Sequence, residues 1–439
     1  MIRDFFEIKN CGSDVFREFL AGITSFLSAM YIVALNPLIL AAAGLPPAAV
    51  LTATVLIAAL GSIGMGLYSN NPFLIAPGMG LNTLFVAAVV SSGDISWQSA
   101  LGCVFYAGLL LLIILAVDRK KRLLSAVPHS LRFGFAGGIG LFIALLGLKS
   151  AEFIVYNPQT GTSLGPLNAH FWTFLIVMVI ALVMALRKVS GGLILGVLAA
   201  CILAWPLGRW WGEMEPVVNY TGWLAWPDVS LFGRMDLMGA AQPACWPFIL
   251  MLTFSILFDS LGTFVGVSEA GDLVDTQGNP HNLELSLKAN AVGAALSGLL
   301  GSSPATAYIE SATGVQVGGR TGLTAVIAGL LFLPLLFFSP LLTLVPSLAT
   351  APLLILAGVY MLKPLIYVRW ERFDEAVPFF MAMFIMPVTQ SITQGIIWGV
   401  LSWTLLKVAG GKFNRITPVM LFLNAVALWL LLNADKYGH

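Results

Sequence analysis

Residues 301–314 read GSSPATAYIESATG and place a proline, glycines and small polar residues in the middle of an apolar segment of membrane length. Residues 71–85 read NPFLIAPGMGLNTLF and interrupt a second apolar segment in the same way. A broken segment leaves backbone N–H and C=O groups unpaired at membrane depth, which is tolerated only where they line a cavity or bind something. Two such breaks at corresponding places in two halves of a chain indicate a transporter built from an inverted repeat.

The composition indicates a protein that crosses a membrane many times. Of its 439 residues, 58% are hydrophobic and 10% are charged, and the mean hydropathy is +0.91, whereas a soluble domain carries about 25% charged residues. The net charge of +1 gives no sign of a nucleic-acid partner. A spanning helix needs about 20 apolar residues. About fourteen segments are predicted to span, several of them short: 19–43, 48–68, 72–91, 98–117, 131–149, 169–186, 191–208, 243–268, 285–301, 303–317, 321–341, 348–367, 375–391 and 393–409.

The two breaks fall in the third of the first seven segments and in the third of the second seven. The predicted fold is therefore an all-α polytopic membrane protein with a 7+7 inverted repeat, whose halves have opposite orientations because seven is odd. Residues 209–242, which contain four tryptophans, are expected to form an external connector. The apolar stretch 416–433 is either a fifteenth span or a helix lying at the membrane interface.

Charge patterning predicts the orientation of the chain. Residues 1–18 carry acids and lack an apolar core before a cleavage site, so they are not a signal peptide and are expected to form a cytoplasmic N-terminus. Lys and Arg gather in alternate loops starting from this end, as expected for cytoplasmic loops. The four cysteines are scattered without metal-ligand spacing, so no metal and no cofactor is expected. These features predict a multi-pass protein of the plasma or inner membrane.

Two carboxylates lie inside apolar segments: Asp259 in LFDSLGTFVG (257–266) and Glu310 in the second break. A charge at mid-membrane depth is costly, and such residues normally face a cavity, a partner or a substrate. The competing interpretation is a structural polar pair that holds helices together. Their position beside broken backbone favours a functional site.

Five motifs occur in order along the chain: SFLSAMYIVALNP (25–37), APGMGLNTLF (76–85), LFDSLGTFVG (257–266), ATAYIESATG (305–314) and GGRTGLTAV (318–326). Together they resemble the signatures of the AzgA-like purine permeases, a branch of the nucleobase–ascorbate transporter superfamily. The resemblance runs from about residue 5 to about residue 430 and implies proton-coupled uptake of adenine, guanine or hypoxanthine by alternating access. It also implies a homodimer through a gate domain. The expected partners are thus the purine, the proton, the lipid membrane and a second copy of the chain.

The resemblance further implies two domains, each drawn from both repeats. A core domain would combine residues 19–118 (spans 1–4) and 243–341 (spans 8–11). A gate domain would combine residues 119–208 (spans 5–7) and 342–439 (spans 12–14 with the C-terminal segment).

Site residues are carried over onto the breaks. Glu310 is expected to bind the purine edge, because a carboxylate accepts two N–H bonds side by side and such charge-assisted bonds are strong. The backbone of Tyr308 and Ile309 would lie beside it. Met79 and Gly80 would face it from the first break, where the ends of the half-helices add their dipoles.

Three further residues complete the predicted site. Asn82 donates and accepts hydrogen bonds and is expected to read the other edge of the ring, unless it serves only as a helix cap. Asp259 is expected to bind substrate and to share proton coupling with Glu310. Thr263 lies one helical turn beyond Asp259 and faces either the cavity or the packing between helices.

At Asn290 the family pattern usually has an aspartate. Because asparagine carries no charge, the resemblance leaves open whether proton coupling in this chain is the same as in its relatives. Other interpretations also stay open at this point. The same fold carries uracil, xanthine, ascorbate or an anion in other transporters, although an acidic pocket disfavours anions. A passive channel and an intramembrane enzyme that uses both carboxylates are more remote.

Overall fold

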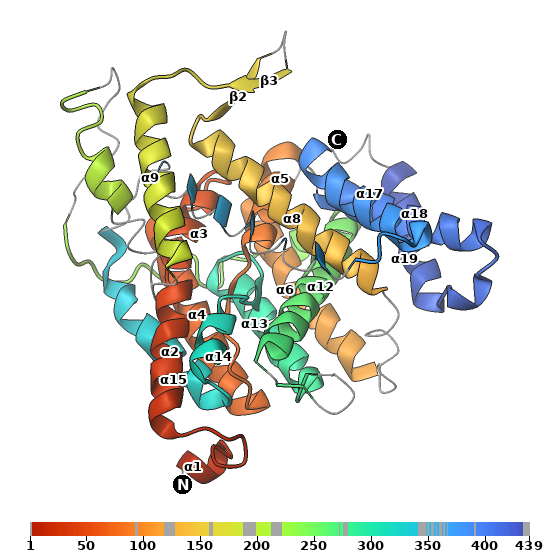
Figure 1. The fold of residues 1–439 in the computed structure, drawn as a ribbon, viewed down its shortest axis with the longest axis horizontal. Coiled ribbons are helices and arrows are strands. Elements are labelled where there is room, and N and C mark those ends of the chain that lie inside the picture. The colour runs from red at the N-terminus through yellow and green to blue at the C-terminus, as the bar shows by residue number, and fades with distance from the viewer. Residues whose placement is uncertain are drawn as a thin grey trace.

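The computed structural model describes residues 2–92, 95–117, 128–157, 161–187, 199–211, 222–271, 273–274, 280–340, 368–389 and 392–432, with isolated positions between 348 and 366. It is predominantly helical (Figure 1). The first part of the chain forms α1 (Ile2–Phe5), α2 (Val15–Ala29), α3 (Ile32–Ala41), α4 (Pro47–Ser69), β1 (Ile75–Pro77), α5 (Met79–Ser92), α6 (Trp97–Val117), α8 (His129–Ser150), β2 (Ile154–Asn157), β3 (Gly161–Leu164) and α9 (Ala169–Leu186).

A short helix, α11 (Leu237–Ala240), lies in the predicted connector. The second part of the chain then forms α12 (Trp246–Ala270), α13 (Leu283–Leu300), β4 (Ala305–Ala307), α14 (Ser311–Val317), α15 (Gly322–Phe332), α17 (Phe373–Thr389), α18 (Ile392–Ala409) and α19 (Pro418–Leu432). Most helices coincide with predicted spans. The predicted spans 191–208 and 348–367 lie largely outside the described residues.

Several helices are apolar enough to lie in a membrane. Within the described parts of the chain, four stretches have both the length and the composition to cross it: Val15–Ala41, Pro47–Ser69, Trp97–Val117 and Pro243–Phe264. The stretch 416–433 is helical as α19, which packs against α18. With 15 residues, α19 is about 22 Å long, shorter than the hydrocarbon core of about 30 Å.

The first predicted span, 19–43, is not one helix. α2 ends at Ala29 and α3 begins at Ile32, so Met30 and Tyr31 form a joint between them. The backbone N–H groups of Val33 and Ala34 bond three residues back at this joint, which is the tighter pattern of a 3₁₀ turn. The joint directs the Tyr31 side chain toward the second broken segment, as described below.

The two broken segments meet as a short antiparallel sheet. β1 pairs with β4 in the register Ile75↔Ala307, Ala76↔Thr306 and Pro77↔Ala305. The prediction of an all-α protein therefore omits these strands and the β2–β3 hairpin. The pairing satisfies backbone groups that the interrupted helices leave open, and all six strand residues are buried.

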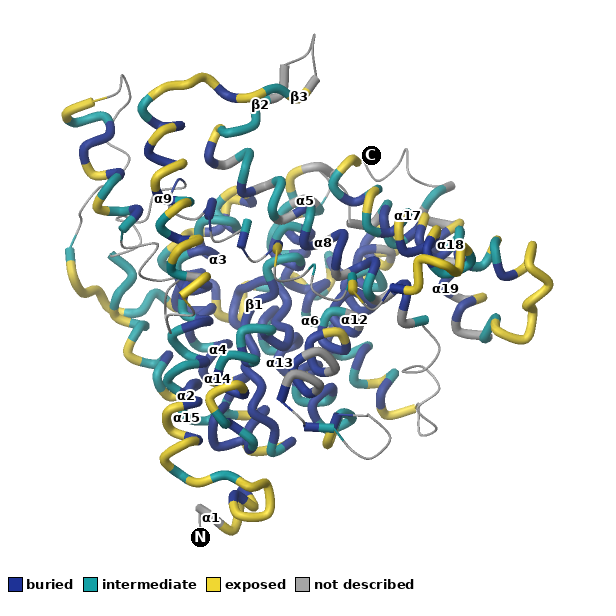
Figure 2. Tube along the Cα trace, in the orientation of Figure 1, coloured by how far each residue is buried: buried dark blue, intermediate teal, exposed yellow. Residues whose placement is uncertain are grey.

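Helix packing forms two groups around this sheet. α4 contacts α3, α13 and α15, while α2 contacts α14 and α15, and α6 lies against α12 and α13. A second group consists of α8, α17, α18 and α19, seen together in Figure 1. Figure 2 shows buried backbone concentrated around β1, α4 and α13. The centre of the buried core is therefore the crossing of the two broken segments.

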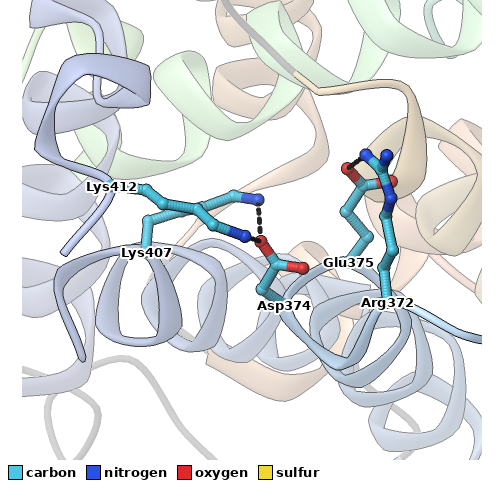
Figure 3. Close-up of polar contacts among 5 residues, drawn as sticks. All are labelled: Arg372, Asp374, Glu375, Lys407 and Lys412. Carbon is cyan, nitrogen blue, oxygen red and sulfur yellow. Dashed lines mark hydrogen bonds and ion pairs between the residues drawn. The ribbon is translucent and has the colours of Figure 1, made fainter. Parts of the chain in front are cut away.

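An ion-pair cluster ties the start of α17 to the end of α18 (Figure 3). Asp374 Oδ2 lies 2.7 Å from Lys407 Nζ and 2.6 Å from Lys412 Nζ. Hydrogen bonds from these two lysines lower the pKa of the Asp374 carboxyl from 3.8 to about 2. Arg372 and Glu375 form a second, more exposed pair at 3.6 Å.

Candidate functional site

The β1–β4 crossing brings the starts of two helices to one place. α5 begins two residues after Pro77, and α14 begins four residues after Ala307. The Gly78 N–H donates to the Pro304 carbonyl at 3.0 Å, and the Tyr308 N–H donates to the Leu74 carbonyl at 2.9 Å. Both N-terminal ends, with their partial positive charge, therefore lie beside the same short sheet.

Glu310 occupies the N-cap position of α14 and keeps part of its surface accessible. The buried Tyr31 hydroxyl donates to Glu310 Oε1 at 2.5 Å. Tyr31 Oη also lies 3.9 Å from Met79 Sδ, so the first helical joint, the first break and the second break meet here. Thr313 Oγ1 contacts the Glu310 carbonyl at 2.7 Å and Ser28 Oγ at 3.0 Å. The Tyr31 hydroxyl thus positions the Glu310 carboxylate, and Thr313 holds the Glu310 backbone.

Asp259 lies on α12 and is also partly exposed. Its carboxylate lies near the Thr306 side chain in β4, whose hydroxyl contacts Ser260 Oγ at 3.0 Å. Asp259 and Glu310 lie within electrostatic range of each other. The Tyr308 side chain lies within electrostatic range of both carboxylates. The structure therefore brings together the two carboxylates that the sequence analysis singled out, which are 51 positions apart in the chain.

Tyr308 and Ile309 lie next to Glu310 with different environments. The buried Tyr308 hydroxyl donates to the Pro77 carbonyl at 2.7 Å, so this side chain joins the two breaks. Ile309 is partly buried and packs on the main hydrophobic core. Met79 and Gly80 are partly exposed at the start of α5, where the Gly80 carbonyl accepts from Thr83 Oγ1 at 2.8 Å.

Asn82 and Thr263 are more deeply placed than the two carboxylates. Asn82 is fully buried, and its Oδ1 accepts from Ser303 Oγ at 2.5 Å. Its Nδ2 has no hydrogen-bond partner among the described residues. Ser303 also reaches Asn36 Oδ1 at 3.4 Å, so Asn82 belongs to a polar contact between three segments. Thr263 is buried on α12 one turn from Asp259.

Sequence reasoning did not place Tyr31, Thr306 and Ser303 in the site. An aromatic residue in an apolar span is usually a packing residue. Small hydroxyl residues in a broken segment indicate only that the helix is interrupted there. The joint at Met30–Tyr31 would have indicated that Tyr31 lies at a special position, but the sequence has no proline or glycine there to reveal the joint. Only the position of Glu310 shows that the Tyr31 hydroxyl has a polar partner.

The site offers acid–base and hydrogen-bonding groups rather than metal ligands. Within the described residues, no group of three or more His, Cys, Asp and Glu side chains is placed to hold a metal ion. The two carboxylates, the Tyr31 hydroxyl and the two helix starts provide hydrogen-bond acceptors and donors for a small polar molecule.

Comparison with known proteins identifies relatives of the whole chain. The profile of a family described as "Permease family" matches residues 16–397. The adenine permease AdeP of Escherichia coli (strain K12) is 38% identical over 98% of this chain and 95% of its own length. The guanine/hypoxanthine permease PbuO of Bacillus subtilis (strain 168) is 35% identical over 95% of this chain and 97% of its own length.

A solved structure supports the fold. The transmembrane domain of the cyanobacterial bicarbonate transporter BicA superposes with a TM-score of 0.63, covering 90% of this chain and 96% of that domain. Its sequence identity is 17%, so the likeness concerns the fold alone. The helical arrangement described above is thus shared with that transmembrane domain.

Proposed function

Since this chain belongs to the permease family, we propose that it is a proton-coupled symporter that imports purine nucleobases. Family membership makes it a transporter rather than an enzyme, and it confirms the resemblance drawn from the five motifs. Its relatives carry the names of adenine and of guanine/hypoxanthine permeases. Adenine, guanine and hypoxanthine are therefore the proposed cargoes, and no cofactor takes part.

The observation that carries the proposal is the placement of Glu310. A partly accessible carboxylate stands at the start of α14, directed by Tyr31 and next to Asp259. A purine presents N–H donors and nitrogen or carbonyl acceptors on its edges. In the proposal, Glu310 accepts from the N–H edge, and the starts of α5 and α14 contribute backbone groups from Met79, Gly80 and Ile309.

The remaining site residues take supporting roles in the proposal. Asn82 and Tyr308 hold the two breaks together from inside, through Ser303 and Pro77 respectively. Thr263 lies one turn from Asp259 and lines the same side of α12. Asp259 and Glu310 bind the purine and exchange the coupling proton, because a carboxylate in the membrane interior is stable only when it is paired or protonated.

Transport by this site requires access from both sides of the membrane in turn. We infer a 7+7 inverted repeat, with broken segments 3 and 10, divided into a core domain (19–118 and 243–341) and a gate domain (119–208 and 342–439). The antiparallel β1–β4 pairing and the packing of α8, α17, α18 and α19 against one another support this division. The core domain, which carries the site, would move against the gate domain.

The location of the protein follows the same reasoning. We infer a multi-pass protein of the plasma or inner membrane with a cytoplasmic N-terminus, on the distribution of Lys and Arg between alternate loops. A homodimer would form through the gate domain, which leaves the core domain free to move.

Uptake assays test the proposed cargo. Labelled adenine, guanine, hypoxanthine and uracil are supplied to cells that lack their own nucleobase carriers, with and without a protonophore. Purine uptake that collapses with the proton gradient supports the proposal, and competition between unlabelled purines identifies the preferred one. Purine uptake that survives the protonophore but requires sodium would contradict proton coupling.

Two variants test the site, Glu310→Gln and Asp259→Asn, each compared with wild type at equal amounts of protein in the membrane. We expect Glu310→Gln to lose binding, and Asp259→Asn to lose accumulation against a gradient. If the wild-type protein takes up none of the purines but transports uracil, xanthine, ascorbate or an anion, the proposed cargo is wrong and the alternative cargo of the same fold replaces it.

A further inference from the structure

A cluster of buried polar side chains lies beside the crossing of the two breaks. Asn36 Nδ2 donates to Thr54 Oγ1 at 2.7 Å and to Ser302 Oγ at 2.9 Å. Ser303 Oγ donates to Asn82 Oδ1 at 2.5 Å and lies 3.4 Å from Asn36 Oδ1. All five side chains are fully buried. This group, the Asn36 cluster, therefore joins α3, α4, the start of α5 and the second break.

The amide nitrogen of Asn36 is fully used in this arrangement. It carries two hydrogens, of which one goes to Thr54 on α4 and the other to Ser302 in the second break. Thr54 donates its own hydroxyl hydrogen to the Val50 carbonyl at 2.7 Å, so its oxygen is the acceptor for Asn36. Asn36 thus links its own helix to two other elements at once.

Tyr31 and Asn36 attach α3 to the second break at two places. Tyr31 is the N-cap residue of α3 and donates to Glu310, which follows β4. Asn36 lies within α3 and donates to Ser302, which precedes β4. The two residues are five positions apart, about 7.5 Å along a helix axis. α3 is therefore held on both sides of β4.

The joint at Met30–Tyr31 makes the second attachment important. Because α2 and α3 are separate helices, the packing of α2 on α14 and α15 does not by itself place α3, which packs on α4, α5 and β1. The bond from Asn36 to Ser302 sets how far along the second break α3 lies. It thereby sets the separation of the Tyr31 hydroxyl and the Glu310 carboxylate.

Buried polar pairs of this kind define an arrangement more than they stabilise it. Replacing both partners of a buried hydrogen bond by apolar groups of the same shape is nearly neutral for stability. A buried polar network specifies instead a single packing of the segments that carry it. In the Asn36 cluster, these segments are the ones that carry Tyr31, Glu310 and the start of α5.

We propose that Asn36 is a positioning residue for substrate binding, which holds the second break in register with α3 so that Tyr31 donates to Glu310. The inference rests on the proposed role of Glu310 in binding the purine. Asn36 is fully buried, so it acts through Tyr31 and Glu310 and does not itself touch the purine.

Two variants remove the bond between α3 and the second break, one from each end. Asn36→Ala deletes the donor and Ser302→Ala deletes the acceptor. We expect each to raise the KM for purine uptake about three- to tenfold with the maximal rate nearly kept, since the upper limit is the loss of the Tyr31 hydrogen bond to Glu310. Because the two changes are independent, either variant that folds tests the proposal.

The control for position within the cluster is Thr54→Val. It removes the other partner of the same amide nitrogen at an equally buried site, but the contact that it breaks leads to α4. A second control is Asn424→Ala, because Asn424 Nδ2 donates to Thr404 Oγ1 at 2.7 Å between α18 and α19. Both controls should lower the thermal unfolding temperature and leave the KM unchanged.

The decisive variant combines Asn36→Ala with Tyr31→Phe. If Asn36 acts by directing the Tyr31 hydroxyl, it has nothing to direct once that hydroxyl is gone. The double variant should therefore have the KM of Tyr31→Phe alone, whereas independent effects would multiply. The proposal is overturned by such a product, by a KM that stays at the wild-type value in Ser302→Ala and Asn36→Ala, or by an equal rise in Thr54→Val.

Fluorine NMR of protein labelled with 3-fluorotyrosine follows the Tyr31 hydroxyl without any substrate. The chain has nine tyrosines, and the resonance that disappears in Tyr31→Phe belongs to Tyr31. Its shift in Glu310→Gln reports the changed hydrogen bond. We expect Ser302→Ala and Asn36→Ala to move this resonance and Thr54→Val to leave it in place. The resonance of Tyr106, whose hydroxyl donates to the Leu237 carbonyl, should stay the same throughout.

This readout separates the inference from the proposed function. A wild-type protein that transports no purine would refute the cargo and still show whether Asn36 governs the contact of Tyr31 with Glu310. A Tyr31 resonance that stays in place in Ser302→Ala and Asn36→Ala would refute the positioning role even where purine uptake is normal. A purely structural role of Asn36 would lower protein yield without moving the resonance or the KM.

Discussion

The two broken segments share a backbone design and differ in chemistry. Each has a three-residue strand, β1 or β4, followed by a helix start, and the two strands pair antiparallel. After β1, a single residue, Gly78, precedes the helix. After β4, three residues precede it, and these are Tyr308, Ile309 and Glu310.

This difference shows how two segments of similar backbone design supply different groups to one candidate site. The first break provides close backbone approach, since a Cβ on Gly78 would lie 2.5 Å from the Thr306 methyl carbon. The second break provides the carboxylate and the tyrosine that ties it to the first. The paired strands build the crossing, and the extra residues of the second break supply its polar groups.

Replacing the carboxylate of the second break should have the largest effect. Glu310→Gln keeps the size of the side chain but removes the charge and one acceptor, so we expect purine uptake to fall roughly 100-fold, equivalent to about 3 kcal/mol. Met79→Leu changes the corresponding helix start with conserved volume and should cost less than about threefold. Labelled uptake at matched membrane levels measures both. Equal losses in the two variants would contradict the asymmetry.

Removing the hydrogen bond from Tyr31, at the joint between α2 and α3, to Glu310 should have the next largest effect on uptake. Tyr31→Phe removes the hydroxyl that donates to Glu310 Oε1. We expect a KM about tenfold higher with the maximal rate nearly kept, because about 1.4 kcal/mol corresponds to the loss of one bond to a charged group. Tyr106→Phe is the control, since that hydroxyl contacts the Leu237 carbonyl at 3.3 Å, in the predicted connector. An unchanged KM in Tyr31→Phe would show that Glu310 needs no such support.

Close approach at the first break is tested by Gly78→Ala. The added methyl group meets the Thr306 methyl carbon, and overpacking of this kind typically costs about 1–3 kcal/mol. We expect a lower thermal unfolding temperature in detergent, together with partial loss of uptake. Thr306→Ser removes the opposing methyl and keeps the hydroxyl, so the double variant should recover stability.

The matched control for this change is Gly64→Ala. Gly64 lies in α4, and a Cβ there would meet nothing within 4 Å. Alanine favours helix over glycine by up to about 1 kcal/mol, so stability should stay the same or rise. Failure of Thr306→Ser to rescue Gly78→Ala would place the strain somewhere other than the strand crossing.

The sequence predicted the parts of this arrangement that depend on local composition. Proline and glycine in an apolar stretch located both breaks, and the cost of a buried charge singled out Asp259 and Glu310. The structure places these two carboxylates within electrostatic range of each other. Their roles in binding and coupling remain predictions, as do those of Asn82, Thr263, Met79 and Gly80.

What the sequence could not supply was pairing between distant segments. Three-residue strands such as Ala305–Ala307 have too few residues for a period-two pattern, so β1 and β4 were predicted as interrupted helix. The joint at Met30–Tyr31 has no breaker residue, and the segment read as one span. The role of a hydroxyl such as Thr306 depends on which side chain faces it, which is a property of the tertiary structure.

The smallest effect is expected far from both breaks, at the α17–α18 contact. Asp374→Asn leaves Lys407, whose side chain is 7% exposed, without its carboxylate partner. We expect the free energy of unfolding to fall by about 1 kcal/mol, with uptake affinity unchanged. Glu375→Gln, which breaks the more exposed pair with Arg372, should cost less.

The pH dependence of this effect distinguishes an ion pair from simple packing. The Asp374 pKa is lowered from 3.8 to about 2 in the folded protein, so its contribution is complete above about pH 4 and is lost as the pH falls toward 2. The stability difference between wild type and Asp374→Asn should therefore be constant from pH 7 to about pH 5 and shrink below about pH 4. A difference that persists at low pH would indicate packing, and a changed uptake affinity would show that the second helix group also contributes to the site.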